Sequence, residues 1–151
     1  MNQAILHHYH SPQAAQQACA TLRNQGLRIG YVPTMGALHP GHASLIQCAR
    51  RENDRVVVSI FVNPLQFNNP DDLEKYPRNQ EADIELLEKW QVDLLFTGTA
   101  EDFLGTASQK NSSELADPGV YAQGLEGLYR PGHFAGVREI VSRLFKFVGP
   151  C

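Results

Sequence analysis

A seven-residue run at 56–62, Val-Val-Val-Ser-Ile-Phe-Val, constrains the fold of this chain more than any other segment. The run is rich in β-branched side chains and almost wholly apolar. This composition is typical of a central strand in a parallel sheet, where both faces are covered. It therefore predicts an α/β fold with helices flanking a parallel sheet.

Patterns before and after this run supply the other elements that such a sheet needs. Apolar spacing predicts helices at about 12–25, 42–53, 77–90 and 136–147, and strands at about 28–33, 56–62 and 92–96. The alternation of strand and helix predicts an open parallel sheet with right-handed crossovers. From 98 to 118 the pattern dissolves into Gly, Thr, Ser, Asn and Asp, which indicates a surface excursion.

Composition narrows the class of protein. A chain of 151 residues with 42% hydrophobic and 19% charged residues suits one globular domain. The net charge of −3 disfavours nucleic acid as a partner. Because the chain has neither a run of about 18 apolar residues nor a signal-peptide pattern, we expect no membrane partner and a cytoplasmic location.

No metal ligand is assigned from the sequence. The three cysteines are odd in number and form no Cys-x-x-Cys, which argues against a disulfide framework and a zinc site. Asp71 and Asp72 could bind a cation, but a helix N-cap and a first-turn acid explain at least one of them equally well. The histidines at 7, 8 and 10 have no carboxylate or thiolate partners in their short extended segment, and we expect them to be solvated.

The segment most informative about function is Val-Pro-Thr-Met-Gly-Ala-Leu-His-Pro-Gly-His at 32–42. It predicts a strand end, a tight turn and a helix start, and helix N-termini attract polyphosphates. We expect Gly36 and Gly41 to let the backbone approach a ligand, with Gly41 in a conformation that a side chain would forbid. His39 and His42 would donate hydrogen bonds to phosphate oxygens, most strongly when protonated. The segment predicts a nucleotide site.

Two further groups of polar residues follow predicted strands or precede predicted helices. Asn63 and Gln66 come directly after the central strand, so they should face the same crevice as the histidines. Neutral amides suit a substrate with hydroxyls and a carboxylate, although Asn63 with its proline neighbour is equally a turn signal. Arg130 and His133 lie on a Gly-Pro turn and either bind an anion or form an exposed loop.

Several blocks, taken together and in order, carry a resemblance. They are 32–42, 56–67, Asp-Leu-Glu-Lys-Tyr-Pro-Arg at 72–78, Arg-Pro-Gly-His-Phe at 130–134, and the pairs at 136–137 and 144–145. On these blocks the chain, from about 27 to 148, resembles the pantothenate synthetase (pantoate–β-alanine ligase) family of the nucleotidyltransferase superfamily. The resemblance implies a Rossmann-like open parallel sheet with flanking helices, truncated after its first half.

The resemblance also implies roles for individual residues. The ATP-binding signature would comprise Met35, Gly36, Ala37, Leu38, His39, Pro40, Gly41 and His42. His42 would be catalytic, with His39 beside it. Gln66 would contact pantoate and later β-alanine, with Asn63 assisting. Weaker candidates are Pro33, Thr34, Phe61, Arg130 and His133.

The implied reaction has two steps. The pantoate carboxylate attacks the α-phosphorus of ATP and releases pyrophosphate, and the amine of β-alanine then opens the mixed anhydride to give pantothenate and AMP. The histidines would stabilise phosphate charge while Asn63 and Gln66 aim the carboxylate. Magnesium would arrive with ATP, held mainly by phosphate oxygens and water. The full-length family would be homodimeric.

Length and local departures qualify the expectation. The family continues with a further strand, a lysine-containing block, a phosphate loop and a smaller C-terminal domain, so residues 1–151 would form an incomplete N-terminal nucleotide-binding domain. Alone, such a fragment should bind ATP weakly, make little pantothenate, and self-associate through the open edge of the strand at 28–33. Leu128 and Tyr129 stand where the family usually has small residues before Arg130, and the resemblance gives no anchor for 101–118. The alternatives are a nucleotidyltransferase for another small acid and a non-catalytic nucleotide-binding module.

Overall fold

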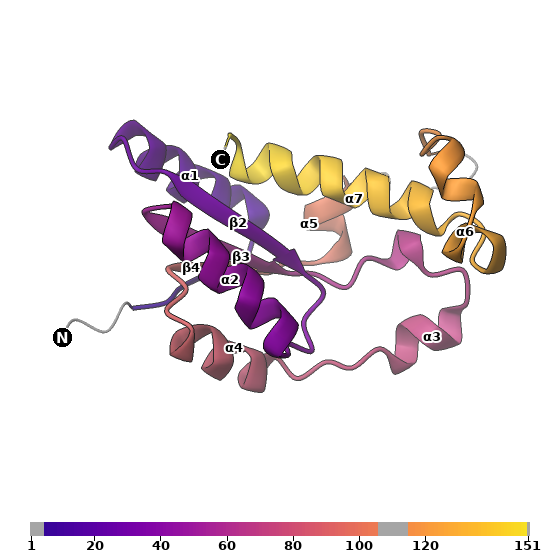
Figure 1. The fold of residues 1–151 in the computed structure, drawn as a ribbon, viewed down its shortest axis with the longest axis horizontal. Helices are drawn as coiled ribbons and strands as arrows, with labels where there is room; N and C mark the ends of the chain where they lie inside the picture. Colours follow the sequence, from indigo (N-terminus) through magenta and orange to yellow (C-terminus); the bar gives the residue numbers. More distant parts are fainter. Residues whose placement is uncertain (1–4, 106–114, 151) are drawn as a thin grey trace.

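A four-stranded sheet forms the centre of the molecule (Figure 1). The computed structural model describes residues 5–105 and 115–150. The strands are β1 (His7–Tyr9), β2 (Ile29–Thr34), β3 (Arg55–Ile60) and β4 (Leu94–Phe96). Their order is β1-β4-β3-β2, and all three pairings are parallel. The predicted open parallel sheet of Rossmann-like type is confirmed.

Helices cover both faces of this sheet (Figure 1). One face carries α1 (Pro12–Asn24), α5 (Ala100–Leu104) and α7 (His133–Val148), and the other carries α2 (Pro40–Glu52) and α4 (Gln80–Lys89). Short elements complete the described chain: the 3-10 helices η1 (Pro64–Gln66) and η4 (Val120–Gln123), and the helices α3 (Pro70–Lys75) and α6 (Glu126–Tyr129). The predicted flanking helices are therefore confirmed, with boundaries shifted by a few residues.

Strand β3 shows why its sequence is apolar at almost every position. The Val57 side chain packs in the core cluster formed with α1, α5 and α7, whereas Val56 and Val58 pack in the cluster formed with α2 and α4. All three are fully buried. Because successive side chains of a strand point to opposite faces, a strand covered on both sides needs apolar residues throughout.

Two elements differ from the sequence expectation. Residues 7–9 form an edge strand paired with β4, and the His8 ring contacts Thr97 (Nε2 to Oγ1, 3.0 Å), so His8 is not simply solvated. The segment after β4, expected to be a surface excursion, begins with helix α5, whose Phe103 and Leu104 are fully buried. Residues 106–114 of that expected excursion lie outside the described part of the chain.

The carboxyl ends of the strands define where a ligand can reach the sheet. A tight turn follows β2 and leads into α2, η1 follows β3, and α7 begins beside η1. Parallel sheets place their binding residues at this edge. None of the helices in the described ranges has the length and hydrophobicity that a bilayer crossing requires.

Candidate functional site

The turn between β2 and α2 is held by an aspartate that lies on another helix. Gly36 and Ala37 have positive φ values of 78° and 51°. The Asp83 carboxylate on α4 accepts hydrogen bonds from two consecutive amides, Ala37 N–H to Oδ2 (2.9 Å) and Leu38 N–H to Oδ1 (2.8 Å). Asp83 is only 4% exposed. A buried carboxylate therefore clamps the turn that precedes the histidines.

Gly41 plays a different part from the one expected. Its φ is not positive, and the left-handed glycine of this turn is Gly36. A Cβ at position 41 would lie 2.8 Å from Cε1 of His39. Glycine is needed at position 41 because the imidazole of His39 folds over it, and the expectation of an unusual backbone conformation there is wrong.

His39 and His42 together cap the start of α2. His39 is the N-cap residue and its Nδ1 accepts the Gly41 N–H (3.1 Å), while Nδ1 of His42 accepts the His39 N–H (3.3 Å). The ring centroids are 4.1 Å apart. A nitrogen that accepts a hydrogen bond carries no proton, so both rings are held as neutral tautomers with the proton on Nε2. Each ring therefore keeps one N–H donor.

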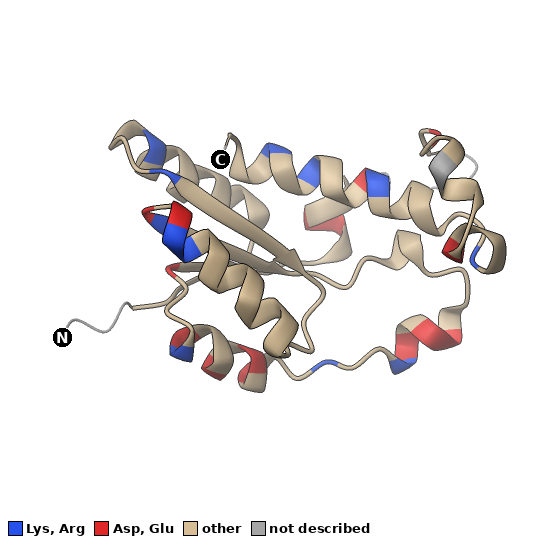
Figure 2. Ribbon diagram, viewed as in Figure 1, with Lys and Arg blue, Asp and Glu red and all other residues tan. Residues whose placement is uncertain are grey.

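The electrostatics of His42 favour this neutral state. Burial lowers the pKa of His42 below its usual value, the neighbouring His39 lowers this pKa further, and the Asp83 charge opposes both effects. Helix α2 has no acidic residue in its first turn, and in Figure 2 the ribbon of that turn carries neither the red of Asp and Glu nor the blue of Lys and Arg. The lowered pKa favours the neutral form of His42 in this structure, whereas the sequence predicted the strongest phosphate contacts for protonated rings.

Backbone amides near the histidines already have partners within the chain. The Gly41 N–H bonds to Nδ1 of His39, and the His42 and Ala43 amides both donate to the His39 carbonyl (2.9 and 3.3 Å). The Ala37 and Leu38 amides are bound by the carboxylate described above. Binding of a phosphate at the helix start would therefore rely on the imidazole Nε2–H groups.

A cavity of about 390 Å³ lies in front of these rings. It brings together eight of the residues that the sequence predicted for the site: Pro33, Thr34, Met35, His39, His42, Phe61, Asn63 and Gln66. Tyr76 and one apolar side of α7 (Val137, Ile140, Val141 and Leu144) complete the wall. Residues from β2, α2 and the end of β3 thus face one space, as the topology predicted.

Asn63 is a structural residue of this cavity. It is 1% exposed, and its Nδ2 donates to the Gly136 carbonyl (3.0 Å) and to Oε1 of Gln66 (3.1 Å). Its Oδ1 accepts the Leu65 N–H (3.2 Å) and caps η1. The turn interpretation of Asn63 is confirmed, and through the same side chain Asn63 orients the amide of Gln66.

Thr34 also uses its side chain within the chain. Its hydroxyl donates to the Ser59 carbonyl (2.8 Å) and accepts the Gly36 N–H (3.2 Å). The hydroxyl thereby joins the ends of β2 and β3 and starts the turn. Of the other predicted residues, Pro40 occupies the first turn of α2 and Leu38 packs against the core cluster beneath it.

Arg130 and His133 join α7 to η1 and do not line the cavity. Nδ1 of His133 lies 2.9 Å from the Gln66 carbonyl oxygen, and Arg130 donates to the same oxygen (3.5 Å). Arg130 also pairs with Glu126 at 3.7 Å. A Cβ at Gly136 would lie 2.2 Å from the Leu65 carbonyl oxygen, so glycine allows this close approach. In the structure Arg130 and His133 secure the loop that carries Gln66.

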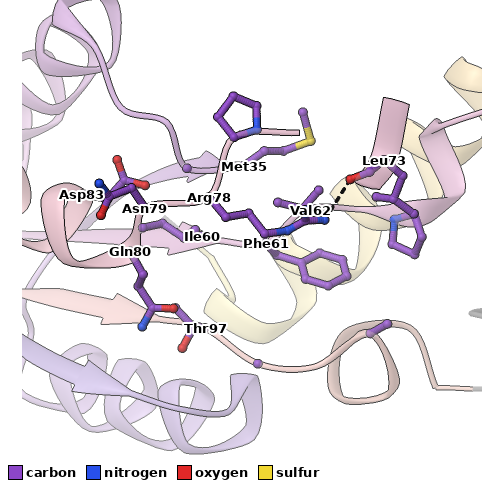
Figure 3. Close-up of a pocket in the computed structure, with 15 residues that line it drawn as sticks. Met35, Ile60, Phe61, Val62, Leu73, Arg78, Asn79, Gln80, Asp83 and Thr97 are labelled. Atoms are coloured by element: carbon purple, nitrogen blue, oxygen red, sulfur yellow. Dashed lines mark hydrogen bonds between the residues drawn. The ribbon is translucent and has the colours of Figure 1, made fainter. Parts of the chain in front are cut away.

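A second cavity, of about 380 Å³, shares Met35 and Phe61 with the first as lining residues. Figure 3 shows the Arg78 guanidinium reaching toward Leu73, whose carbonyl accepts from Nη2 at 3.0 Å, with Asp83 at the opposite end. Arg78 thus closes the carboxyl end of α3. Sequence reasoning gave no indication of this cavity.

Two residues of the site were missed by sequence reasoning. Asp83 carries a detectable signal because it lies one helical turn before Leu87, which is fully buried, so a charge stands on the apolar side of its helix. Tyr76 lines the first cavity, and burial, aided by the Asp83 charge, raises the pKa of its hydroxyl. Nothing in its sequence neighbourhood distinguishes Tyr76 from a surface tyrosine.

Known proteins share this sequence and this fold. A family model described as pantoate-beta-alanine ligase matches residues 7–151. The pantothenate synthetase of Brucella ovis is 49% identical over 141 residues, which are 93% of this chain and 47% of that protein.

Solved structures agree with the sequence relatives. The pantoate-beta-alanine ligase of Francisella tularensis, complexed with beta-gamma ATP and beta-alanine, superposes with a TM-score of 0.86 at 40% identity over 97% of this chain and 54% of that one. The pantothenate synthetase of Thermus thermophilus superposes with a TM-score of 0.79 at 39% identity, over 95% of this chain and 49% of that one. The chain spans about half the length of the relatives it matches. It belongs to the pantoate–β-alanine ligase family.

Proposed function

We propose that this chain supplies the nucleotide-binding part of a ligase that joins pantoate to β-alanine at the expense of ATP, giving pantothenate, AMP and pyrophosphate. The observation that carries the proposal is the shared cavity, which His39, His42 and Gln66 line together. The structure of the Francisella tularensis relative, which is named for its complex with ATP and β-alanine, supports the same substrates.

In the first proposed step, a pantoate carboxylate oxygen attacks the α-phosphorus of ATP. A new P–O bond forms, the bond to the β-phosphate oxygen breaks, and pyrophosphate leaves. The Nε2–H groups of His39 and His42 stabilise charge that grows on phosphate oxygens, and the Gln66 amide orients the carboxylate. Transfers of this kind depend mainly on positioning and charge stabilisation.

In the second proposed step, the amine of β-alanine attacks the acyl carbon of the mixed anhydride. The C–N bond forms, the nitrogen gives up one proton, the bond from carbon to the phosphate oxygen breaks, and AMP leaves. A mixed anhydride hydrolyses readily, so the site must restrict water. Phe61 and the apolar side of α7 provide such a wall.

Magnesium is proposed to arrive bound to ATP. The described residues contain no cluster of three or more His, Cys, Asp or Glu side chains that would hold a metal ion. Asp83, the buried carboxylate beside the turn that precedes the histidines, accepts backbone amide hydrogen bonds with both of its oxygens. Phosphate oxygens and water are therefore the expected ligands.

The proposal extends to organisation. Residues 1–151 would form the N-terminal nucleotide-binding region of a cytoplasmic, homodimeric enzyme, in which further chain completes the nucleotide crevice. We expect the 151 residues alone to bind ATP weakly and to make little pantothenate, because β2 has one strand partner in the described part of the chain. Turnover comparable to that of a version extended through the rest of the family's length would contradict this.

The proposed function is tested by the release of pyrophosphate from ATP that depends on pantoate. The assay uses the whole protein that the gene encodes and contains no β-alanine. His42→Asn should lower this rate at least about a hundredfold, since loss of one charge-stabilising donor has this effect in other enzymes. His10→Asn is the matched control, because His10 is exposed and its ring also lies 4.1 Å from that of a second histidine.

Three results would separate the proposal from its alternatives. Release that depends on another small acid in a substrate screen would indicate a different nucleotidyltransferase. ATP binding without release would indicate a nucleotide-binding module. An unaffected rate in His42→Asn would overturn the role given to this ring.

A further inference from the structure

Asp83 occupies a position that usually attracts a bound anion. Consecutive backbone N–H groups of a left-handed turn converge to form an anion-binding concavity, and here the amides of Ala37 and Leu38 converge on the two oxygens of one carboxylate (2.9 and 2.8 Å). Asp83 lies in the first turn of α4, where the helix dipole favours negative charge. Within the described ranges Asp83 forms no ion pair, so the amides are its principal partners.

The chain is shaped around this contact. A Cβ at Gly36 would lie 2.9 Å from Oδ2 of Asp83, so glycine leaves room for the carboxylate. Ala37 adopts a left-handed conformation (φ 51°) that is unfavourable for a residue with a side chain. The turn therefore needs an external partner to hold it, and Asp83 is that partner.

His39 follows this turn directly. Its backbone amide binds Nδ1 of His42 and its ring binds the Gly41 amide, so a shift of the turn moves both imidazoles. We propose that Asp83 is a positioning residue: by binding the Ala37 and Leu38 amides, its carboxylate fixes the turn that delivers His39 and His42 to the cavity. The effect on catalysis rests on the proposed function, whereas the effect on the turn rests on geometry alone.

Asp83→Asn tests the proposal because asparagine keeps the size of the side chain but offers one acceptor oxygen for two amides and no charge. The matched control is Asp93→Asn. Asp93 is also mostly buried and also accepts a backbone amide, that of Val56 (2.7 Å), but it comes directly before β4, at the opposite end of the sheet from the histidines.

Two structural readouts apply whether or not the protein is an active ligase. Hydrogen exchange at the Ala37 and Leu38 amides should accelerate about tenfold or more in Asp83→Asn. The variant loses a hydrogen bond to a charged group, and a bond of that kind changes an equilibrium by about this factor. The pKa of His42, followed by NMR, should fall further below its usual value, because the Asp83 charge raises this pKa whereas burial and His39 lower it. Asp93→Asn should change neither.

The catalytic readout is the pantoate-dependent release of pyrophosphate, normalised to folded protein. Asp83→Asn should lower kcat about tenfold or more with little change in KM for pantoate, because Gln66 is held from η1 and α7 rather than from this turn. If Asp83→Asn does not fold, Asp83→Glu, which keeps the charge but displaces the oxygens, should show the same faster exchange.

Unchanged amide exchange and an unchanged His42 titration in Asp83→Asn would overturn the proposal. So would a loss of stability equal to that of Asp93→Asn with a normal rate per folded molecule, which is the result expected of a purely structural residue. If wild-type protein releases no pyrophosphate, the proposed function fails, while the exchange and titration results still decide the role of Asp83.

Discussion

At the scale of single residues, His39 combines two tasks that one substitution can separate. Its ring caps α2 through Nδ1 and lines the cavity, where we propose that Nε2–H binds phosphate. Asparagine is a good N-cap residue but is shorter than an imidazole. His39→Asn should therefore keep the stability of wild type within about 0.5 kcal/mol, whereas His39→Ala should lose about 1 kcal/mol. Both should lose pyrophosphate release. Urea unfolding together with that assay measures the two effects, and full activity in His39→Asn would show that the ring serves only as a cap.

Two histidines also make stability depend on pH. Burial lowers the pKa of His8 and of His42 below the ordinary 6.5. The unfolded chain therefore binds more protons than the folded chain in the interval from 6.5 down to the lowered values, so folding stability decreases as pH falls through this interval. The free energy of unfolding, measured in urea at a series of pH values, should show the decrease, and His8→Asn with His42→Asn should flatten it. A slope that survives in this double variant would assign the effect to other groups.

At the scale of elements, the contact between α7 and η1 sets the width of the cavity. A Cβ on Gly136 would meet the Leu65 carbonyl oxygen at 2.2 Å, which forces the two backbones apart. Gly136→Ala should destabilise the fold by about 1–3 kcal/mol. Gly124→Ala is the control, because nothing lies within 4 Å of its Cβ position and its φ of −102° suits any residue. Thermal unfolding of both variants tests this, and equal unfolding temperatures would show that α7 can shift at no cost.

The elements also show how far the sequence was informative. Long periodic segments such as α1 and α7, and the apolar β3, could be predicted because burial on a face repeats along them. Strand β1 could not, since three residues, two of them histidines, show no alternation. Helix α5 was hidden by the surrounding Gly and Ser, although Thr99 and Asp102 form a capping box at its start. That Met35, His39 and His42 share a cavity could be predicted from their position after a strand, but the clamp by Asp83 depends on contacts across 46 positions of sequence.

At the scale of the whole molecule, the sheet ends at β2, which pairs with β3 alone among the described strands. Strand edges with unpaired backbone groups recruit other strands. Exposed apolar side chains, Leu45 on α2 and Phe145 on α7 (57% and 48% exposed), lie on two of the helices that contact this strand. The relatives are about twice as long as the part of them that this chain matches.

We therefore expect the 151-residue chain, when produced alone, to self-associate as its concentration rises. Light scattering should report species larger than a monomer whose mass grows with concentration. A version extended to the length of the relatives should not associate through the edge of β2 in this way. Leu45→Lys with Phe145→Lys should reduce the association of the short chain, because charge beside a strand edge opposes strand pairing. Leu125→Lys is the control, since that side chain is 86% exposed but lies outside the sheet and its flanking helices. A monodisperse monomer at high concentration would show that the edge of β2 is protected within these residues, and would remove the reason for expecting a weak nucleotide crevice in the chain alone.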